Sequence, residues 1–98
     1  MAIIKNELFS ALADPTRRGI LKLLKNEDMN ASDIAAQFNM TKPAMSFHLT
    51  VLKNAGLITG DKRGQNIIYS LNTTVMQEAL NWFFDIMNKG GDEDVEDK

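Results

Sequence analysis

The sequence contains no cysteine, which excludes disulfide bridges, thiolate metal sites, iron–sulfur clusters and cysteine nucleophiles. It has only two prolines, and none of its apolar runs is longer than four residues. A membrane-spanning helix needs roughly 18 apolar residues or more. The N-terminus also lacks the basic region and apolar stretch of a secretory signal. These absences predict a soluble, cytoplasmic protein.

The length of the chain, 98 residues, corresponds to one domain. Hydrophobic residues make up 44% of it and charged residues 24%, a composition that excludes disorder as the main state. A domain of this size buries only about 60 to 65% of the surface that its unfolded chain exposes. A second copy of the chain is therefore a natural source of additional core.

Charge is distributed unevenly along the sequence. The net charge of −2 disfavours nucleic acid as a partner, but residues 92–98 alone carry five acids against one lysine. Residues 41–63 carry four cations against one acid, Asp61, and so form a local basic segment. We predict a folded domain over residues 1–91 and a flexible acidic tail over residues 92–98.

Hydrophobic spacing predicts four helices in the first part of the chain. The first covers residues 3–13, and Asp14 with Pro15 ends it and caps the second helix. Asn30 caps a short third helix, residues 39–41 form a tight turn, and Thr41 caps a fourth helix that Gly56 ends. The expected core positions of the four helices are Ile4, Leu8, Ala11, Leu12, Ile20, Leu21, Leu23, Leu24, Ile34, Ala35, Phe38, Met45, Leu49 and Leu52.

A hairpin and a last helix follow. Residues 57–59 and 66–71 are β-prone, and the polar, glycine-containing residues 60–65 between them predict a hairpin with a basic tip. Asn72 or Thr73 caps a helix that runs through Met87. The predicted fold is mainly α with a small β-hairpin: a winged helix-turn-helix with five helices and a two-stranded wing.

The last helix is apolar over an arc of about 200° on a helical wheel. A helix on one core needs an apolar face of roughly 100° or somewhat more, so this helix requires a second neighbour, for which a partner subunit is the natural candidate. The aromatic cluster of Trp82, Phe83 and Phe84 is typical of a core or a dimer seam rather than of a ligand pocket.

Two short helices joined by a tight turn and followed by a basic hairpin are typical of DNA-binding domains whose second helix enters the major groove. The fourth helix carries small polar and basic groups opposite its core stripe, which favours DNA over an ordinary solvated face. A winged-helix module that binds protein remains the alternative. The candidate DNA-binding residues are Thr41, Lys42, Pro43, Ser46, Phe47, His48, Thr50 and Lys53 on this helix, with Lys62 and Arg63 on the wing.

The single histidine, His48, has no partners for a metal site or a catalytic triad. It is either a hydrogen-bonded packing residue or a phosphate contact. The sequence also lacks a phosphate-binding glycine loop, a Gly-x-Ser-x-Gly elbow and a zinc-protease helix motif. We therefore expect no enzymatic activity, no catalytic residue, no cofactor, no metal and no small-molecule substrate.

Four segments of the chain form a distinctive combination of motifs. They are Ala-Leu-Ala-Asp-Pro-Thr-Arg-Arg-Gly-Ile-Leu at residues 11–21, Lys-Pro-Ala-Met-Ser-Phe-His-Leu at 42–49, Ala-Gly-Leu-Ile at 55–58 and Tyr-Ser-Leu at 69–71. This combination resembles the ArsR/SmtB family of winged-helix repressors. The resemblance covers nearly all of residues 3–89. Within the family, Tyr-Ser-Leu-Asn-Thr-Thr-Val and Asn-Trp before Asn-Lys-Gly most resemble the SdpR-type autorepressors.

The resemblance implies a homodimer, joined through the first and last helices, that represses transcription from an inverted-repeat operator. The interface residues expected from it and from the apolar arc are Ile4, Leu8, Leu80, Trp82, Phe83, Phe84 and Met87. Metal-sensing relatives carry cysteines on the third helix or histidine and carboxylate ligands on the last, which this chain lacks. Phe47 stands where relatives often have Arg, Gln or His. The subgroup further implies an inducing or sequestering protein partner at a membrane.

Overall fold

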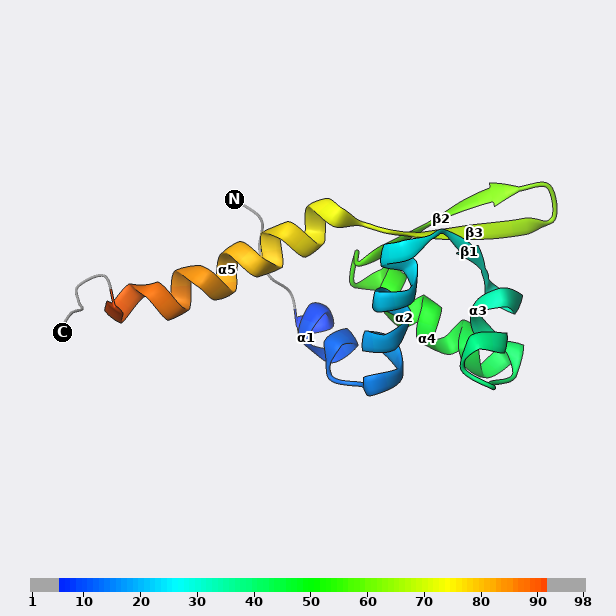
Figure 1. Ribbon diagram of the computed structural model, residues 1–98, viewed down its shortest axis with the longest axis horizontal. Coiled ribbons are helices and arrows are strands. Elements are labelled where there is room, and N and C mark those ends of the chain that lie inside the picture. The colour runs from blue at the N-terminus through cyan, green and yellow to red at the C-terminus, as the bar shows by residue number, and fades with distance from the viewer. Residues whose placement is uncertain (1–5, 92–98) are drawn as a thin grey trace.

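The computed structural model describes residues 6–91, which form five helices and three short strands (Figure 1). The elements in chain order are α1 (Asn6–Leu12), α2 (Pro15–Asn26), β1 (Met29–Asn30), α3 (Ala31–Gln37), α4 (Lys42–Asn54), β2 (Ile58–Arg63), β3 (Asn66–Leu71) and α5 (Thr73–Gly91). The predicted winged helix-turn-helix, mainly helical, is confirmed. In Figure 1 the hairpin and α5 extend from opposite ends of the body that α1–α4 form.

Local side-chain caps set the helix boundaries as the sequence predicts. Asp14 accepts a hydrogen bond from the Arg17 amide at 3.1 Å, Asn30 from the Asp33 amide at 2.8 Å, and Thr41 from the Ala44 amide at 3.3 Å. Each bond satisfies an N–H group that the first turn of a helix leaves without a partner. The last helix is capped by the first of the two candidates, since the Val75 amide donates to the Asn72 side chain at 3.3 Å.

The turn between α3 and α4 depends on a left-handed residue. Asn39 has φ +53°, and the Met40 amide donates to the Ala35 carbonyl at 3.1 Å. Gly56 ends α4 in the same way, with φ +80° and a 3.0 Å bond from the Leu57 amide to the Leu52 carbonyl. Both are Schellman-type helix ends, in which such bonds satisfy the last carbonyls of the helix. The predicted tight turn at residues 39–41 and the glycine cap at Gly56 are confirmed.

The wing differs from the prediction in two ways. Strand β2 runs through Arg63, so only Gly64 and Gln65 form the turn, and Lys62 and Arg63 pair with Ile67 and Asn66 of β3. The predicted six-residue loop was wrong because residues 60–63 lack apolar alternation and are held extended by pairing with β3. The sheet also has three strands, since β1 pairs antiparallel with β3 in the order β1-β3-β2.

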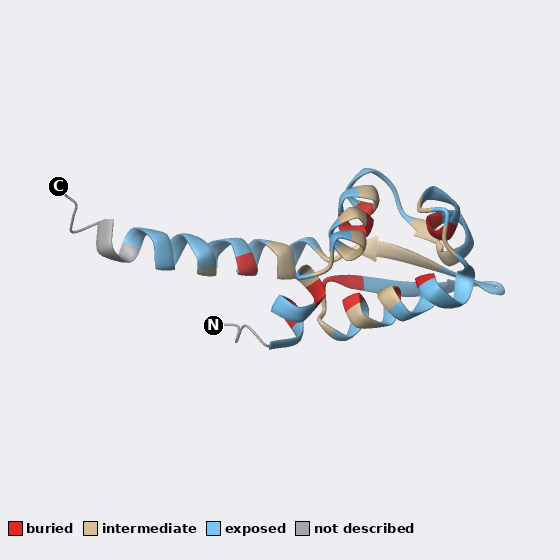
Figure 2. Cartoon of the chain, turned by 90° about the horizontal axis from the view of Figure 1, so that it is seen from below, coloured by how far each residue is buried: buried red, intermediate tan, exposed pale blue. Residues whose placement is uncertain are grey.

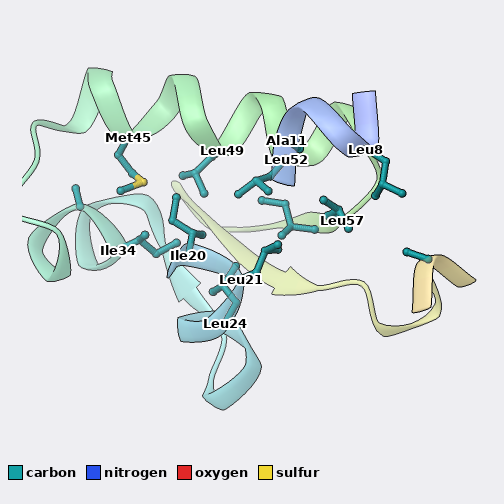
Figure 3. Close-up of a cluster of buried hydrophobic side chains, with 13 residues drawn as sticks. Leu8, Ala11, Ile20, Leu21, Leu24, Ile34, Met45, Leu49, Leu52 and Leu57 are labelled. Carbon is teal, nitrogen blue, oxygen red and sulfur yellow. The ribbon is translucent and has the colours of Figure 1, made fainter. Parts of the chain in front are cut away.

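One hydrophobic core joins α1–α4 to the base of the wing (Figure 3). Met45, Leu49 and Leu52 of α4 are each at most 1% exposed and meet Ile20 and Ile34, which are fully buried. The rest of the buried cluster is Leu8, Ala11, Leu21, Leu24, Ala35, Leu57, Ile58 and Ala79. Burying such side chains is the main favourable term that fixes α4 against α2 and α3. The predicted core stripe of α4 is confirmed, whereas Leu12, Leu23 and Phe38 are only partly buried.

The two terminal helices depart from their predicted ends. Helix α1 covers Asn6–Leu12 rather than residues 3–13, and residues 3–5 lie outside the described part of the chain. Helix α5 continues past Met87 to Gly91, so the glycine pair belongs to the helix. Figure 2 shows α5 exposed along most of its length beyond the body. Within the described residues, no helix combines the length and hydrophobicity needed to cross a membrane.

Candidate nucleic-acid interface

The outer face of α4 is polar and solvent-exposed. Lys42, Ser46, Thr50 and Lys53 are all exposed on the side opposite the core stripe, and Thr41 and Pro43 at the start of the helix are exposed as well. The positive end of the helix dipole adds to the charge of Lys42. Small hydroxyl groups and lysines in this arrangement can donate to phosphate oxygens and base edges. The Thr41 hydroxyl oxygen accepts a hydrogen bond from the Ala44 amide, so Thr41 caps the helix whether or not it also contacts DNA.

Phe47 lies on this face and is 63% exposed. Its ring meets the ring of the next residue, His48, edge to face, with the centroids 5.6 Å apart. The prediction that Phe47 stays outside its own core is confirmed. A large apolar ring at this position cannot form hydrogen bonds with bases, but it can pack against a thymine methyl group.

The wing and α4 border one shared hollow of about 180 Å³. Lys42 and Ser46 line it from α4, Gln65 from the wing turn and Asn66 from the start of β3. The remaining lining residues are Asn30, Ala31, Ser32, Ile67 and Tyr69. The structure therefore brings the start of the predicted recognition helix and the wing together at one surface. Sequence reasoning gave Asn30 a capping role alone and gave Ser32, Gln65 and Asn66 no role at this site, because the pairing of β1 with β3 brings the start of α3 to the wing.

An ion pair with Asp61 partly neutralises the positive charge of Arg63 on the wing. The Arg63 Nε group donates to Asp61 Oδ2 at 2.8 Å, and both side chains are well exposed. An exposed pair of this kind is weak, so a phosphate can replace Asp61 as the partner of Arg63. Lys62 is exposed beside it. Lys53 extends toward the base of the wing, since a Cβ atom placed on Gly60 would lie 3.7 Å from Lys53 Nζ.

His48 is partly buried beneath this face. Arg17 Nη1 lies 3.2 Å from His48 Nδ1 and connects α2 to α4. This bond supports the hydrogen-bonded packing role, and a phosphate contact through the other ring nitrogen stays a prediction. Arg17 itself was given no role from the sequence, because it lies 31 residues from His48 and only the fold brings the two together.

Asp14 adds a negative charge close to Arg17, whose side chain contacts His48. The hydrogen bond from the Arg17 amide lowers the pKa of the Asp14 carboxyl, and desolvation opposes this shift. The positive charge of Arg17 also lowers it. Asp14 is thus held as a carboxylate at the start of α2, which suits a residue that caps a helix N-terminus.

The apolar side chains of α5 divide into two groups. Ala79 is 6% exposed, and Trp82 and Phe83 meet Phe9 of α1, with ring centroids 5.3 Å and 6.2 Å from Phe9. The second group faces solvent and consists of Leu80 at 46%, Phe84 at 47%, Ile86 at 52% and Met87 at 62% exposed. One chain therefore leaves much of the predicted apolar arc uncovered.

The expected interface set stays a prediction, and the structure gives the surroundings of three of its residues within one chain or leaves them undescribed. Leu8 is 3% exposed, so it belongs to the core of its own chain and is not free to meet a partner. Trp82 is partly buried against Phe9 in its own chain. Ile4 lies outside the described residues. Phe9, which sequence reasoning omitted, is 37% exposed and joins the aromatic cluster between α1 and α5.

Comparison with known proteins shows which family this chain resembles. Residues 14–59 match the family described as "Bacterial regulatory protein, arsR family". The chain is 54% identical over 85 residues to the transcriptional repressor SdpR of Bacillus subtilis (strain 168), which covers 87% of this chain and 94% of that protein. The chain belongs to the ArsR family.

Solved structures agree with this assignment. An ArsR-like transcriptional regulator from Rhodococcus sp. RHA1 superimposes with a TM-score of 0.77 at 29% identity, over 85% of this chain and 78% of that one. A second match is the homodimeric winged helix-turn-helix DNA-binding domain Mb0332 from Mycobacterium bovis, with a TM-score of 0.67 at 22% identity, over 86% and 82% of the two chains. This ArsR-family chain is a DNA-binding transcriptional repressor and not an enzyme.

Proposed function

We propose that this repressor acts as a homodimer on an inverted-repeat operator, including one at its own gene, and that it does so without sensing a metal. The observation that carries the proposal is the shared surface of α4 and the wing. Exposed Lys42 and Ser46 of α4 line one hollow together with Gln65 of the wing turn, and Thr50 is exposed on the same helix. A surface of this kind presents side chains to base edges and to the flanking phosphates at the same time.

The uncovered face of α5 supports the homodimer. Leu80, Phe84 and Met87 follow the i, i+4, i+7 spacing of one helix stripe, and each is more than 40% exposed. Large contiguous apolar surfaces of this kind mark sites of protein association. A two-fold dimer presents its two recognition helices to two half-sites of opposite orientation, which is why the operator is an inverted repeat.

The absence of metal sensing rests on the residues that would bind a metal. The sequence has no cysteine, and its single histidine contacts Arg17. In the part of the chain that the structure describes, no three His, Asp or Glu side chains gather in a metal-binding arrangement. An inducing or sequestering protein partner at a membrane stays a prediction of the family resemblance alone.

Fluorescence anisotropy tests the proposal. The probe is a labelled duplex from upstream of the protein's own gene, and the control is a duplex of the same composition in scrambled order. We expect the upstream duplex to bind at least about a thousandfold more tightly than the scrambled one at physiological salt. Equal affinity for both would contradict the proposal and favour the protein-interaction module as the function of the wing and α4.

A further inference from the structure

One arginine of α2 joins its own helix to two others. Arg17, near the start of α2, donates through Nε to the Ala11 carbonyl at 3.0 Å and through Nη2 to the Ser10 carbonyl at 3.0 Å. Both carbonyls belong to the last turns of α1. The remaining nitrogen, Nη1, lies 3.2 Å from Nδ1 of His48 in the middle of α4. Arg17 therefore holds the end of α1 and the predicted recognition helix at the same time.

The contact with Arg17 determines which ring nitrogen of His48 carries the proton. A guanidinium group is a donor only, so Nδ1 of His48 must be the acceptor in the bond with Arg17. The ring proton of the neutral histidine then resides on Nε2. A bond from a charged donor to a partly buried acceptor is stronger than one between neutral groups, which makes it suitable for holding two helices at a fixed angle.

Helix α1 is in turn held to α5. Phe9 of α1 packs edge to face on Trp82 and Phe83 of α5, and these two rings lie 5.2 Å apart. A continuous set of contacts thus runs from α5 through Phe9 to the end of α1, and from there through Arg17 to His48 on α4. In the proposed dimer, α5 carries the association surface and α4 carries the DNA-reading surface.

We propose that Arg17 is a positioning residue for operator binding, which uses His48 to fix the recognition helix relative to the dimerisation helices. This inference rests on the proposed function, because it requires two recognition helices joined by a dimer. Its consequence is that the distance between the two recognition helices is fixed before DNA binds. The protein then discriminates between operators by the spacing of their half-sites, and it does so more sharply than a loosely joined dimer.

The neighbouring arginine provides a matched control. Arg18 Nη1 donates to the Leu12 carbonyl at 2.7 Å, so Arg18 also holds the end of α1. This hydrogen bond involves no group on α4. The variants Arg17→Met and Arg18→Met each remove one charge and the bonds to α1 while keeping an unbranched side chain. Only Arg17→Met removes the bond to His48.

The experiment measures spacing selectivity. A duplex with an inverted repeat is first selected from a random pool by the wild-type protein, and a second duplex carries two extra base pairs between the half-sites. We expect wild type and Arg18→Met to share a large affinity ratio between the two duplexes, and Arg17→Met to reduce that ratio about tenfold. A general loss of stability would weaken binding to both duplexes and leave the ratio unchanged.

Two substitutions at His48 keep the test decisive if Arg17→Met does not fold. Asn retains an acceptor oxygen near the position of Nδ1, whereas Leu removes it and keeps similar bulk. We expect His48→Asn to retain the spacing ratio of wild type and His48→Leu to lose it as Arg17→Met does. Unchanged ratios in Arg17→Met or in His48→Leu would overturn the inference and leave the proposed function intact. A wild-type protein that binds both duplexes equally would contradict the proposed inverted-repeat function itself.

Discussion

The phenyl ring of Phe9 on α1 meets the indole ring of Trp82 on α5 edge to face, with the centroids 5.3 Å apart and the planes inclined by 61°. Aromatic pairs prefer this arrangement, and each stabilises the fold by about 1 kcal/mol beyond the surface that it buries. The contact therefore commits Trp82 to its own chain. Leu80, Phe84 and Met87, on another side of α5, stay exposed and form the association surface of the proposed dimer.

This division of α5 predicts how self-association responds to mutation. Replacing Phe84 and Met87 by alanine should weaken the dimer, since central apolar side chains at interfaces contribute about 2 kcal/mol or more when truncated. The single chain should keep its fold, because both side chains are largely exposed in it. Sedimentation equilibrium measures the dissociation constant, and thermal melting measures the fold.

The polar side of α5 offers a control with the same spacing. Asp85→Ala combined with Asn88→Ala changes two exposed positions that follow Phe84 and Met87 by one residue. This double variant should associate like wild type. If wild type itself sediments as a monomer at micromolar concentration, the proposed dimer is wrong. The pair Trp82→Ala and Phe83→Ala should also weaken association, but part of that loss is unfolding, because both rings pack on Phe9.

The ion pair on the wing predicts opposite effects for its two members. Arg63→Ala should weaken binding to every duplex and reduce the slope of log K against log salt concentration by about one per lost phosphate contact in each subunit. Asp61→Asn should strengthen binding to every duplex, because Arg63 no longer has a carboxylate at 2.8 Å that competes with phosphate. Anisotropy titrations at several salt concentrations measure both effects. An unchanged slope and affinity for Arg63→Ala would mean that the wing end only forms a turn.

Most of the helical framework was predictable because its signals are local. Asp14, Asn30 and Thr41 each bond an amide three residues ahead, and Met45, Leu49 and Leu52 repeat at helical spacing. Such features depend on a few neighbouring residues and hardly on the rest of the chain.

The features that sequence reasoning missed are long-range. The two-residue strand β1 exists only because it pairs with β3, and residues 60–63 are extended only because β3 holds them. The bond between Arg17 and His48 and the cluster of Phe9 with α5 join residues far apart in the sequence. No local pattern encodes these contacts. The helix face that forms the candidate site was therefore predictable from the sequence, whereas the contacts that hold this helix against α1 and α2 were not.

Asp14 predicts an acid-sensitive contribution to stability. Its pKa is lowered below the ordinary value of 3.8, chiefly by the hydrogen bond from the Arg17 amide. A carboxyl with a lowered folded pKa stabilises the fold above its unfolded pKa, and this contribution is lost as the pH falls through the folded pKa. Wild type should therefore lose stability below about pH 4 more steeply than Asp14→Asn, which keeps a capping oxygen but does not titrate. Urea titrations across the acid range compare the two proteins, and parallel curves would contradict the assignment.

The acidic tail predicts a change in non-specific binding. Residues 92–98 carry five acids and one lysine, and they lie outside the described part of the chain. If they compete with DNA phosphates for the basic surface, deleting them should tighten binding to scrambled duplex at low salt. The effect should disappear at high salt, because screening removes interactions between exposed charges. A variant with the five acids replaced by Asn and Gln separates loss of charge from loss of chain, and no change in either protein would exclude competition.

Phe47 yields the sharpest prediction about DNA reading. The side chain is 63% exposed on the outer face of α4, so Phe47→Ala should leave the fold and the dimer unchanged. The ring can pack against a thymine methyl group, and its loss should remove the preference at one base step per half-site. The expected cost is about 1 to 3 kcal/mol, the range typical of a mismatched base pair.

Replacing thymine by uracil tests this contact from the DNA side. Uracil lacks only the C5-methyl group, so wild type should lose affinity for a half-site with uracil at the contacted step, whereas Phe47→Ala should bind both duplexes equally. Because the ring also packs on His48 with centroids 5.6 Å apart, thermal melting of Phe47→Ala is the control for a packing role. A large drop in melting temperature with unchanged operator preference would assign Phe47 to packing. A uracil duplex that binds wild type as tightly as the thymine duplex would rule out the methyl contact.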